Sequence, residues 1–220
     1  MMDSVPPPQL WILFASKAPI AVIVREGPRK WSHLILWHTN TDTFEPGQWL
    51  KGRLEYASLS SDGRHMAMAV KATGKRVAET GKSEYTLVSR PPYFTALAIS
   101  FHFFVRGNNV VFEDDELVWE TGGTIALPAG TCTLYPIKTK ALRESTPETT
   151  PAVWRKKSLD GIWQSPQGRK VQVKEGKLYD LMNNESRLLF DANPYQPTPV
   201  ETPEWAKTWN AEPPTIRTAS

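Results

Sequence analysis

Short apolar runs, separated by turn-forming residues, follow one another along most of the chain. Residues 8–14 (PQLWILF) and 18–27 (APIAVIVREG) are rich in Ile, Val and aromatic side chains and contain proline at their margins, as short β-strands often do. Another apolar run, residues 34–37 (LILW), leads into residues 39–42 (TNTD), whose side chains can bond nearby backbone groups in a turn. Because helical periodicity is scarce, the pattern predicts an all-β chain of short strands.

The clearest hairpin signal is residues 59–70 (LSSDGRHMAMAV). Asp62-Gly63 favours a tight reversal, and Met66, Met68 and Val70 then occupy alternate positions, as in a strand. A weaker copy follows at residues 165–173 (SPQGRKVQV). The matching pairs are Ser60 and Ser165, Gly63 and Gly168, Arg64 and Arg169, Met66 and Val171, and Met68 and Val173. The repetition indicates that the first hairpin is one module of several.

The middle of the chain continues the strand pattern with one ambiguity. Residues 96–104 (ALAISFHFF) fit either a short helix or a buried strand, because a continuous apolar run has no distinguishing period. Residues 107–109 (GNN) predict a hairpin turn. Residues 109–120 (NVVFEDDELVWE) predict two further short strands on either side of Glu113-Asp114-Asp115.

Turn glycines recur at Gly27, Gly63, Gly107 and Gly168, and the first two intervals, of about 36 and 44 residues, approach the roughly 40 to 50 residues of a propeller blade. The S-x-D-G-R turn and the apolar alternation after it resemble the blade motif of TolB-like and WD40-like β-propellers. Residues 18–72 and 88–101 are similar to a group of uncharacterised bacterial proteins that look propeller-like, and the resemblance covers residues 10–140. It implies a propeller-like array of short antiparallel sheets, incomplete or with about four to five blades. It transfers no catalytic residue.

That family carries a glycine-rich run soon after the segment RPPYFTALA, whereas this chain has FHFFVRGNNVVF there, so no role of that run is carried over. Residues 1–140 are predicted to form the β-rich propeller-like core, and residues 153–190 to add hairpins to the same domain. Residues 141–152 (ALRESTPETTPA) are predicted to be an exposed linker or loop, because few of their side chains can offset the entropy of ordering. Residues 191–220 are predicted to be a Pro-rich extended tail. Its aromatic residues Tyr195, Trp205 and Trp209 suggest that parts of the tail dock on a surface.

Composition narrows the classes of function. Apolar residues make up 40% and charged residues 22% of the chain, as in ordinary soluble globular proteins. The net charge is +3 and the longest basic run is Arg155-Lys156-Lys157, so there is no strong nucleic-acid signal. The N-terminus lacks a basic leader, and no apolar run approaches the ~20 residues that span a membrane. A lone cysteine, Cys132, favours a reducing, cytoplasmic compartment.

Candidate catalytic chemistry is sparse. The four histidines make no ligand-spaced set, although His38 and Asp42 at the end of a strand could form a site. Residues 113–116 (EDDE) could bind a cation or could be a solvated hairpin turn, and both interpretations stay open. No nucleophile-elbow, phosphate-loop or dinucleotide motif is present, and we predict no cofactor and no enzyme activity.

The aromatic residues Trp37, Trp49, Tyr93 and Trp119 lie near predicted turns, where loops carry function, and are the candidate binding residues. Each could instead cap the core. The pattern predicts a non-enzymatic interaction protein, an accessory subunit of a bacterial complex that binds another protein through a loop face. One alternative is a metal-dependent or carboxylate-based hydrolase that uses His38, Asp42, Asp114 and Asp115. Another is a carbohydrate or small-ligand binder, which a pocket with two Trp rings and a polar rim would favour.

Overall fold

The computed structural model of the chain describes residues 6–27, 29–72, 84–100, 110–113, 116–119, 138–139, 161–181 and 186–212. These residues form strands and connecting segments, with a short 3-10 helix at Glu204–Lys207, and they confirm the predicted all-β class. The strands are β1 (Gln9–Phe14), β2 (Ile20–Glu26), β3 (Trp31–His38), β4 (Thr43–Leu59), β5 (Met66–Ala72), β6 (Glu84–Ser89), β7 (Ala96–Ser100), β8 (Val110–Glu113), β9 (Glu116–Trp119), β10 (Lys138–Thr139), β11 (Ile162–Gln164), β12 (Lys170–Lys174), β13 (Lys177–Asp180) and β14 (Arg187–Asp191).

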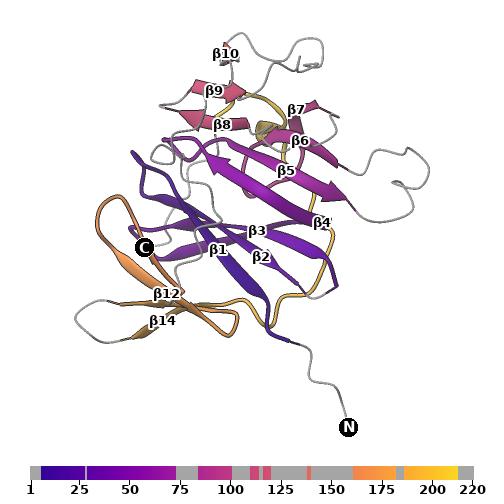
Figure 1. The fold of residues 1–220 in the computed structure, drawn as a ribbon. Coiled ribbons are helices and arrows are strands. Elements are labelled where there is room, and N and C mark those ends of the chain that lie inside the picture. The colour runs from indigo at the N-terminus through magenta and orange to yellow at the C-terminus, as the bar shows by residue number, and fades with distance from the viewer. Residues whose placement is uncertain are drawn as a thin grey trace, which may run out of the picture.

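Strands β1 to β7 form one antiparallel sheet in which each strand pairs with the next along the chain (Figure 1). The 17-residue strand β4 belongs to two parts of this sheet, because residues 43–51 pair with β3 and residues 52–59 pair with β5. We call β1–β3 with residues 43–51 the central layer, and residues 52–59 with β5–β7 the second layer. Gly52 stands at the change of partner, where a Cβ atom would lie 3.0 Å from the carbonyl oxygen of Lys71.

Strands β11, β12, β13 and β14 form a separate antiparallel sheet, the third layer, again in sequence order. A small sheet contains β8 and β9 as an antiparallel pair and β10 parallel to β9. Glu113 and Glu116 face each other across the β8–β9 hairpin, which confirms the two strands predicted around the acidic cluster. The small sheet lies against β4 and β5, where the backbone N–H of Phe112 donates to Ser58 Oγ at 3.0 Å.

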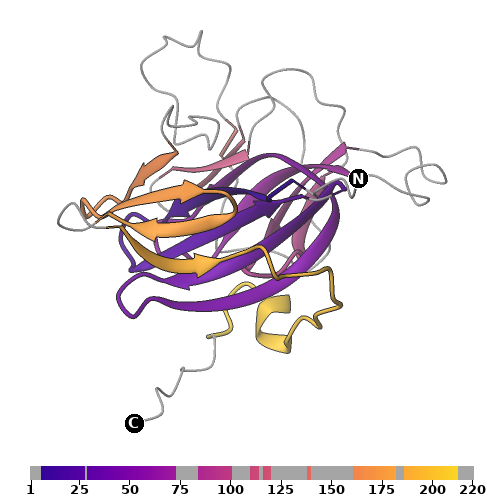
Figure 2. The same ribbon diagram turned by 90° about the horizontal axis from the view of Figure 1, so that it is seen from below.

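The central layer is buried on both faces, since the second layer covers one and the third layer the other (Figures 1 and 2). The core against the second layer includes Leu13, Val22, Val24, Leu34, Leu54, Met66 and Met68. The core against the third layer includes Leu10, Ile12, Ile23, Ile35, Trp37, Val171, Leu178 and Phe190. A strand that is buried on both faces does not need to alternate apolar and polar residues, which explains the unbroken apolar run of β2.

The turn predicted at Asp62-Gly63 is confirmed. The N–H of Ser60 donates to the carbonyl of His65 at 2.9 Å and the N–H of Gly63 donates to that of Ser60 at 3.0 Å. Gly63 has a φ of +74°, which a glycine adopts without the steric cost of a side chain. Asp62 Oδ1 accepts hydrogen bonds from Ser60 Oγ at 2.6 Å and from the Arg64 N–H at 2.9 Å, so its carboxylate stabilises the turn.

The second copy of this turn is one residue shorter than the first. The N–H of Ser165 donates to the carbonyl of Arg169 at 2.8 Å, so Arg169 stands where His65 stands in the first turn. Gly168 again has a positive φ, +88°, and its N–H donates to Ser165. After the glycine, the structural alignment of the two turns is therefore shifted by one position from the sequence alignment, because Arg169 corresponds to His65 and not to Arg64. The repeated hairpin itself is present in the second layer, before β5, and in the third layer, before β12.

The tail is extended from the end of β14 and docks on the layers as far as residue 212 (Figure 2). Three side chains of the central and second layers, Arg25, Gln48 and Arg90, donate to its backbone carbonyls. The acceptors are Ala192 and Tyr195 for Arg25, Val200 for Gln48, and Trp205, Thr208 and Ala211 for Arg90. The docking suggested by the tail aromatics is therefore observed, with Trp209 only 8% exposed.

The described sheets close into neither a barrel nor a propeller. The ambiguous run at residues 96–104 begins as strand β7, and its remainder lies outside the described residues. The linker predicted at residues 141–152 and the turn at residues 107–109 also lie outside them. Among the described residues no helix is long and apolar enough to cross a membrane.

Candidate binding site

Trp37 is fully buried, so its predicted place on an exposed binding surface is wrong. Its ring packs against Phe14 and Phe44, with centroids 5.8 and 5.7 Å away, in the core beneath the third layer. Its Nε1 donates to Asp42 Oδ1 at 3.2 Å, and the Arg169 guanidinium lies 5.1 Å from the ring centroid. Of the two interpretations offered by the sequence, Trp37 fits the core position.

Trp49 is half-buried and stacks on the imidazole of His33, with ring centroids 4.1 Å apart and planes 6° apart. The Arg25 guanidinium lies 4.9 Å from the Trp49 ring centroid. Burial, reinforced by the charge of Arg25, lowers the pKa of His33 to about 4 although the hydrogen bond with Gly47 opposes the shift. At neutral pH the uncharged ring therefore donates from Nε2 to the Gly47 carbonyl at 3.1 Å. One face of Trp49 is thus engaged within the protein.

Tyr93 is half-buried and contacts the tail, because its ring meets Trp205 edge to face at 5.8 Å. Burial raises the pKa of the Tyr93 phenol, with the charge of Glu45 acting in the same direction. The side chain of Trp119 lies outside the described part of the chain. The described contacts do not bring Trp37, Trp49 and Tyr93 together on one open surface.

The proposed His38–Asp42 pair is not formed. His38 Nε2 lies 2.5 Å from Glu45 Oε1, whereas Asp42 binds two arginines. Asp114 and Asp115 lie outside the described residues. Within the described ranges, no three His, Cys, Asp or Glu side chains are placed to share a metal ion.

Asp42 instead belongs to an ion-pair network that joins the β3–β4 turn to the third layer. Arg169 lies 2.8 Å from Asp42 and 2.6 Å from the buried Asp180, and Arg187 lies 2.7 Å from Asp42. Burial alone would raise the pKa of Asp42, but the hydrogen bonds from the two arginines outweigh it and hold this pKa below its usual value. Since its charges are mutually balanced, we interpret the network as a structural connection between layers.

A cleft that the sequence did not indicate lies between the start of β1 and the third layer. We call it the tryptophan cleft. Trp11 of β1 and Trp163 of β11 line it, with ring centroids 6.4 Å apart and planes at 88°. Its cavity is about 390 Å³, and its remaining lining residues are Pro6, Pro7, Pro8, Gln9, Leu10, Gly161, Val173, Glu175 and Gly176. Gly176 allows Pro8 to approach closely, because a Cβ atom there would meet the Pro8 ring at 2.8 Å.

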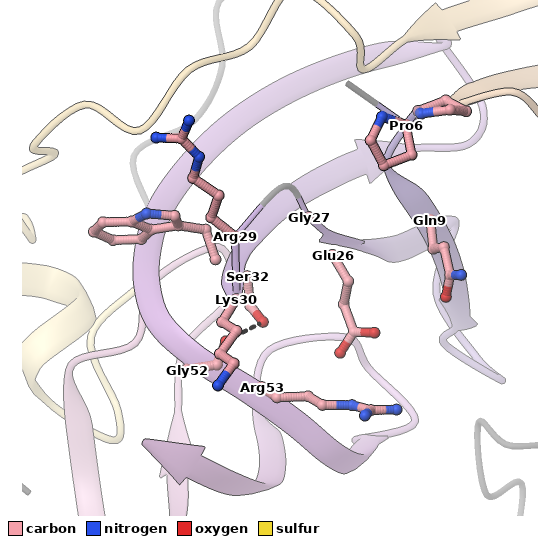
Figure 3. Close-up of a pocket in the computed structure, with 11 residues that line it drawn as sticks. Pro6, Gln9, Glu26, Gly27, Arg29, Lys30, Ser32, Gly52 and Arg53 are labelled. Atoms are coloured by element: carbon pink, nitrogen blue, oxygen red, sulfur yellow. Dashed lines mark hydrogen bonds between the residues drawn. The ribbon is translucent and has the colours of Figure 1, made fainter. Parts of the chain in front are cut away.

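A second pocket, which we call the basic pocket, shares Pro6, Pro7 and Gln9 with the tryptophan cleft. It has a cavity of about 330 Å³ and is shown in Figure 3. Its charged lining residues are Glu26, Arg29, Lys30 and Arg53. In Figure 3 the Glu26 carboxylate points toward the side of the pocket that holds Lys30 and Arg53, while Arg29 extends away from it.

Glu26 connects the two pockets. Trp11 Nε1 donates to Glu26 Oε2 at 3.2 Å, across the β1–β2 pair. The second carboxylate oxygen, Glu26 Oε1, is buried. Burial raises the pKa of Glu26, and the Trp11 hydrogen bond, the charge of Arg53 and a hydrogen bond from the Leu54 backbone oppose this shift without cancelling it. The Glu26 side chain thus lines the basic pocket while its carboxylate holds Trp11 of the neighbouring cleft.

The turn that carries two of the cations has an unusual backbone. Arg29 and Lys30 have φ values of +62° and +63°, a region that residues other than glycine seldom occupy. Hydrogen bonds hold this turn on both sides: the Gly27 N–H donates to the Trp31 carbonyl, and the Gly52 N–H to that of Lys30, each at 2.9 Å. The backbone under these two side chains is therefore fixed, although the side chains themselves are exposed.

Sequence inspection missed these pockets because their walls come from distant parts of the chain. It selected aromatic residues near turns, whereas Trp11 and Trp163 lie within strands of different layers. The available signal was a Trp in each of two short edge strands, Trp11 in β1 and Trp163 in β11. This signal predicts a site only when the two strands are known to lie side by side. Comparisons with protein-family models, with curated proteins and with solved structures found no match for the chain. The likeness to propeller proteins stays a prediction from sequence.

Proposed function

We propose that the protein is a non-enzymatic binding protein that holds a small saccharide in the tryptophan cleft. The observation that supports this most directly is the position of Trp11. Its ring lines the cleft, and its Nε1 donates to the carboxylate of Glu26. The indole that forms part of the cleft wall is thereby fixed by the carboxylate that lines the neighbouring basic pocket.

A saccharide matches this combination chemically. One face of a pyranose ring carries C–H groups that pack on an indole, while its rim carries hydroxyls that need acceptors and donors. Gln9 and Glu175 give the lining polar groups that can pair with hydroxyls. A cavity of about 390 Å³ is within the range of small-ligand sites.

The tryptophan cleft lies at the edge of the central and third layers, whereas the sequence predicted a binding site on a loop face. The expected platform of Trp37, Trp49 and Tyr93 is less favourable, because their rings pack on Phe44, His33 and Trp205. A hydrolase would require several of His38, Asp42, Asp114 and Asp115 to converge. The first two have separate partners, which weakens that alternative.

The three layers are stacked antiparallel sheets, and the central and third layers have four strands each, as propeller blades do, which supports a propeller-like relationship. The single Cys132 supports a reducing compartment such as the cytoplasm. An accessory role in a bacterial complex is compatible with a ligand-binding subunit.

The proposal is tested by calorimetric titration with a panel of neutral sugars: glucose, galactose, N-acetylglucosamine and their β-linked trisaccharides. We expect at least one to bind with a dissociation constant below about 1 mM, and W163A to weaken it about tenfold or more through the lost ring contact. The matched control is W205A, which removes another half-buried Trp that does not line the cleft. No binding by any panel member, or equal binding by W163A, would refute the proposal.

A further inference from the structure

We propose that the ligand of the tryptophan cleft carries a phosphate or sulfate ester, and that Lys30 and Arg53 of the adjacent basic pocket bind this group. The inference rests on the proposed function for the sugar ring and adds the chemical class of its substituent. It follows from three features: the shared wall of the two pockets, the charge of the basic pocket and the fixed turn beneath Lys30.

The two pockets share Pro6, Pro7 and Gln9, and Glu26 of the basic pocket bonds Trp11 of the cleft. A ligand whose ring contacts Trp11 therefore has the basic pocket as its neighbour on the Glu26 side. The basic pocket has a cavity of about 330 Å³, which is ample for a tetrahedral ester group.

Charge in the basic pocket is unbalanced. It has three cations, Arg29, Lys30 and Arg53, and one carboxylate, that of Glu26. Arg53 acts on Glu26 through its charge, whereas no ion pair of Arg29 or Lys30 with another described residue is observed, in contrast to Arg169, which binds both Asp42 and Asp180. Unpaired cations on a concave surface attract an anion, and a phosphate or sulfate can accept several charge-assisted hydrogen bonds at once.

The basic pocket is also organised before any ligand binds. The carbonyl of Lys30 accepts from the N–H of Gly52, which precedes Arg53 in the chain, so the two cations are carried by hydrogen-bonded backbone. Figure 3 shows the Glu26 carboxylate pointing toward the Arg53 guanidinium, with Lys30 on the neighbouring turn. The ester oxygens can accept from Lys30 and Arg53 while the sugar ring contacts Trp11. The cleft and the cations thereby recognise different parts of one ligand.

The test compares each neutral monosaccharide with its 6-phosphate and 6-sulfate by calorimetry, with inorganic phosphate as a further titrant. For at least one sugar we expect an ester to bind about tenfold or more tightly than the neutral form, and added salt to reduce only this advantage. The double variant K30Q/R53Q should lose the advantage, so that it binds the ester and the neutral sugar with equal affinity. K51Q, which removes an exposed cation of β4 outside the pocket, is the matched control and should keep it.

The two proposals fail in distinguishable ways. If esters bind no better than neutral sugars, or keep their advantage in K30Q/R53Q, the anion subsite is refuted while the saccharide site stands. If inorganic phosphate and the esters bind equally well, with no effect of W163A on the esters, the assignment of a sugar ring to the cleft is refuted. In that case the linked ligand proposed in this subsection is refuted as well.

Discussion

His33 and His65 are two buried histidines, 1% and 2% exposed, whose Nε2 atoms each meet one backbone carbonyl. The acceptors are Gly47 at 3.1 Å and Trp209 at 3.2 Å. Burial lowers the pKa of both side chains from 6.5 to about 4, and the charges of Arg25 and Arg90 add to the effect. Both imidazoles are therefore neutral in the folded protein at pH 7, whereas in the unfolded chain they take up protons below about pH 6.5.

We expect acidification to destabilise the protein through these two residues. A group whose pKa is lowered in the fold contributes full stability above its unfolded pKa and loses it as the pH falls toward the folded pKa. The loss between about pH 6.5 and pH 4 is on the order of 2 to 3 kcal/mol for each histidine. Urea unfolding, followed by tryptophan fluorescence at several pH values, measures it.

The double variant H33Q/H65Q isolates the effect, because glutamine can donate to the same carbonyls and does not titrate. Its free energy of unfolding should fall less steeply than that of wild type across this pH window. Equal slopes in the two proteins would show that the histidines do not control acid stability. Each single variant should give an intermediate slope.

The two turns before β5 and β12 form a matched pair at the scale of one element. Gly63 and Gly168 both have positive φ values and both donate to a serine carbonyl three residues earlier. Their surroundings differ, because a Cβ atom at position 63 would lie 2.8 Å from Ile20 Cγ2, whereas nothing lies within 4 Å of one at position 168. The first turn is packed against the β1–β2 hairpin, and the second is open.

Alanine substitution should separate backbone strain from packing. G168A should cost about 1 to 2 kcal/mol, the strain of a side chain in the left-handed region. G63A should cost about 1 to 3 kcal/mol more, since Ile20 is β-branched and cannot move aside freely. Chemical denaturation of both variants measures the difference. Equal losses of stability would contradict the packing contribution.

The sequence predicted the individual elements better than their assembly. Short-range patterns were sufficient for β1, β2, β5 and the Asp62-Gly63 turn, because strand propensity and turn chemistry depend on neighbouring residues. Trp37 was misplaced because its cover comes from Phe190 and Arg169, far along the chain. The tryptophan cleft was missed for the same reason, since Trp11 and Trp163 belong to different layers.

At the scale of the whole molecule, the tail ties the layers together. Arg90 is 1% exposed, and its guanidinium donates to the tail carbonyls of Trp205, Thr208 and Ala211 and lies 4.9 Å from the Trp205 ring centroid. Ala206 and Trp209 are buried beside it. A cation at this depth depends on these acceptors, because burying it without partners is costly.

Removing residues 203–220 should therefore lower stability by several kcal/mol, through the exposure of apolar surface and the loss of the Arg90 acceptors. In the full chain, R90K should itself cost about 1 to 3 kcal/mol, since lysine cannot reproduce the forked geometry. In the truncated chain R90K should cost much less, and this non-additivity measures the coupling. Additive losses in denaturation experiments would show that Arg90 and the tail act independently.

The central layer also has a consequence for the order in which the protein is made. One of its faces packs against the third layer and Tyr195 of the tail, and Arg25 bonds a carbonyl 167 positions later in the chain. At about 5 to 20 residues per second, a ribosome needs roughly 8 to 35 seconds to synthesise that interval. During this time Ile12, Ile35 and Trp37 lack the cover that Val171, Leu178 and Phe190 of the third layer provide. The nascent chain therefore exposes an apolar sheet face, to which a chaperone or a neighbouring nascent chain can bind before the third layer is synthesised.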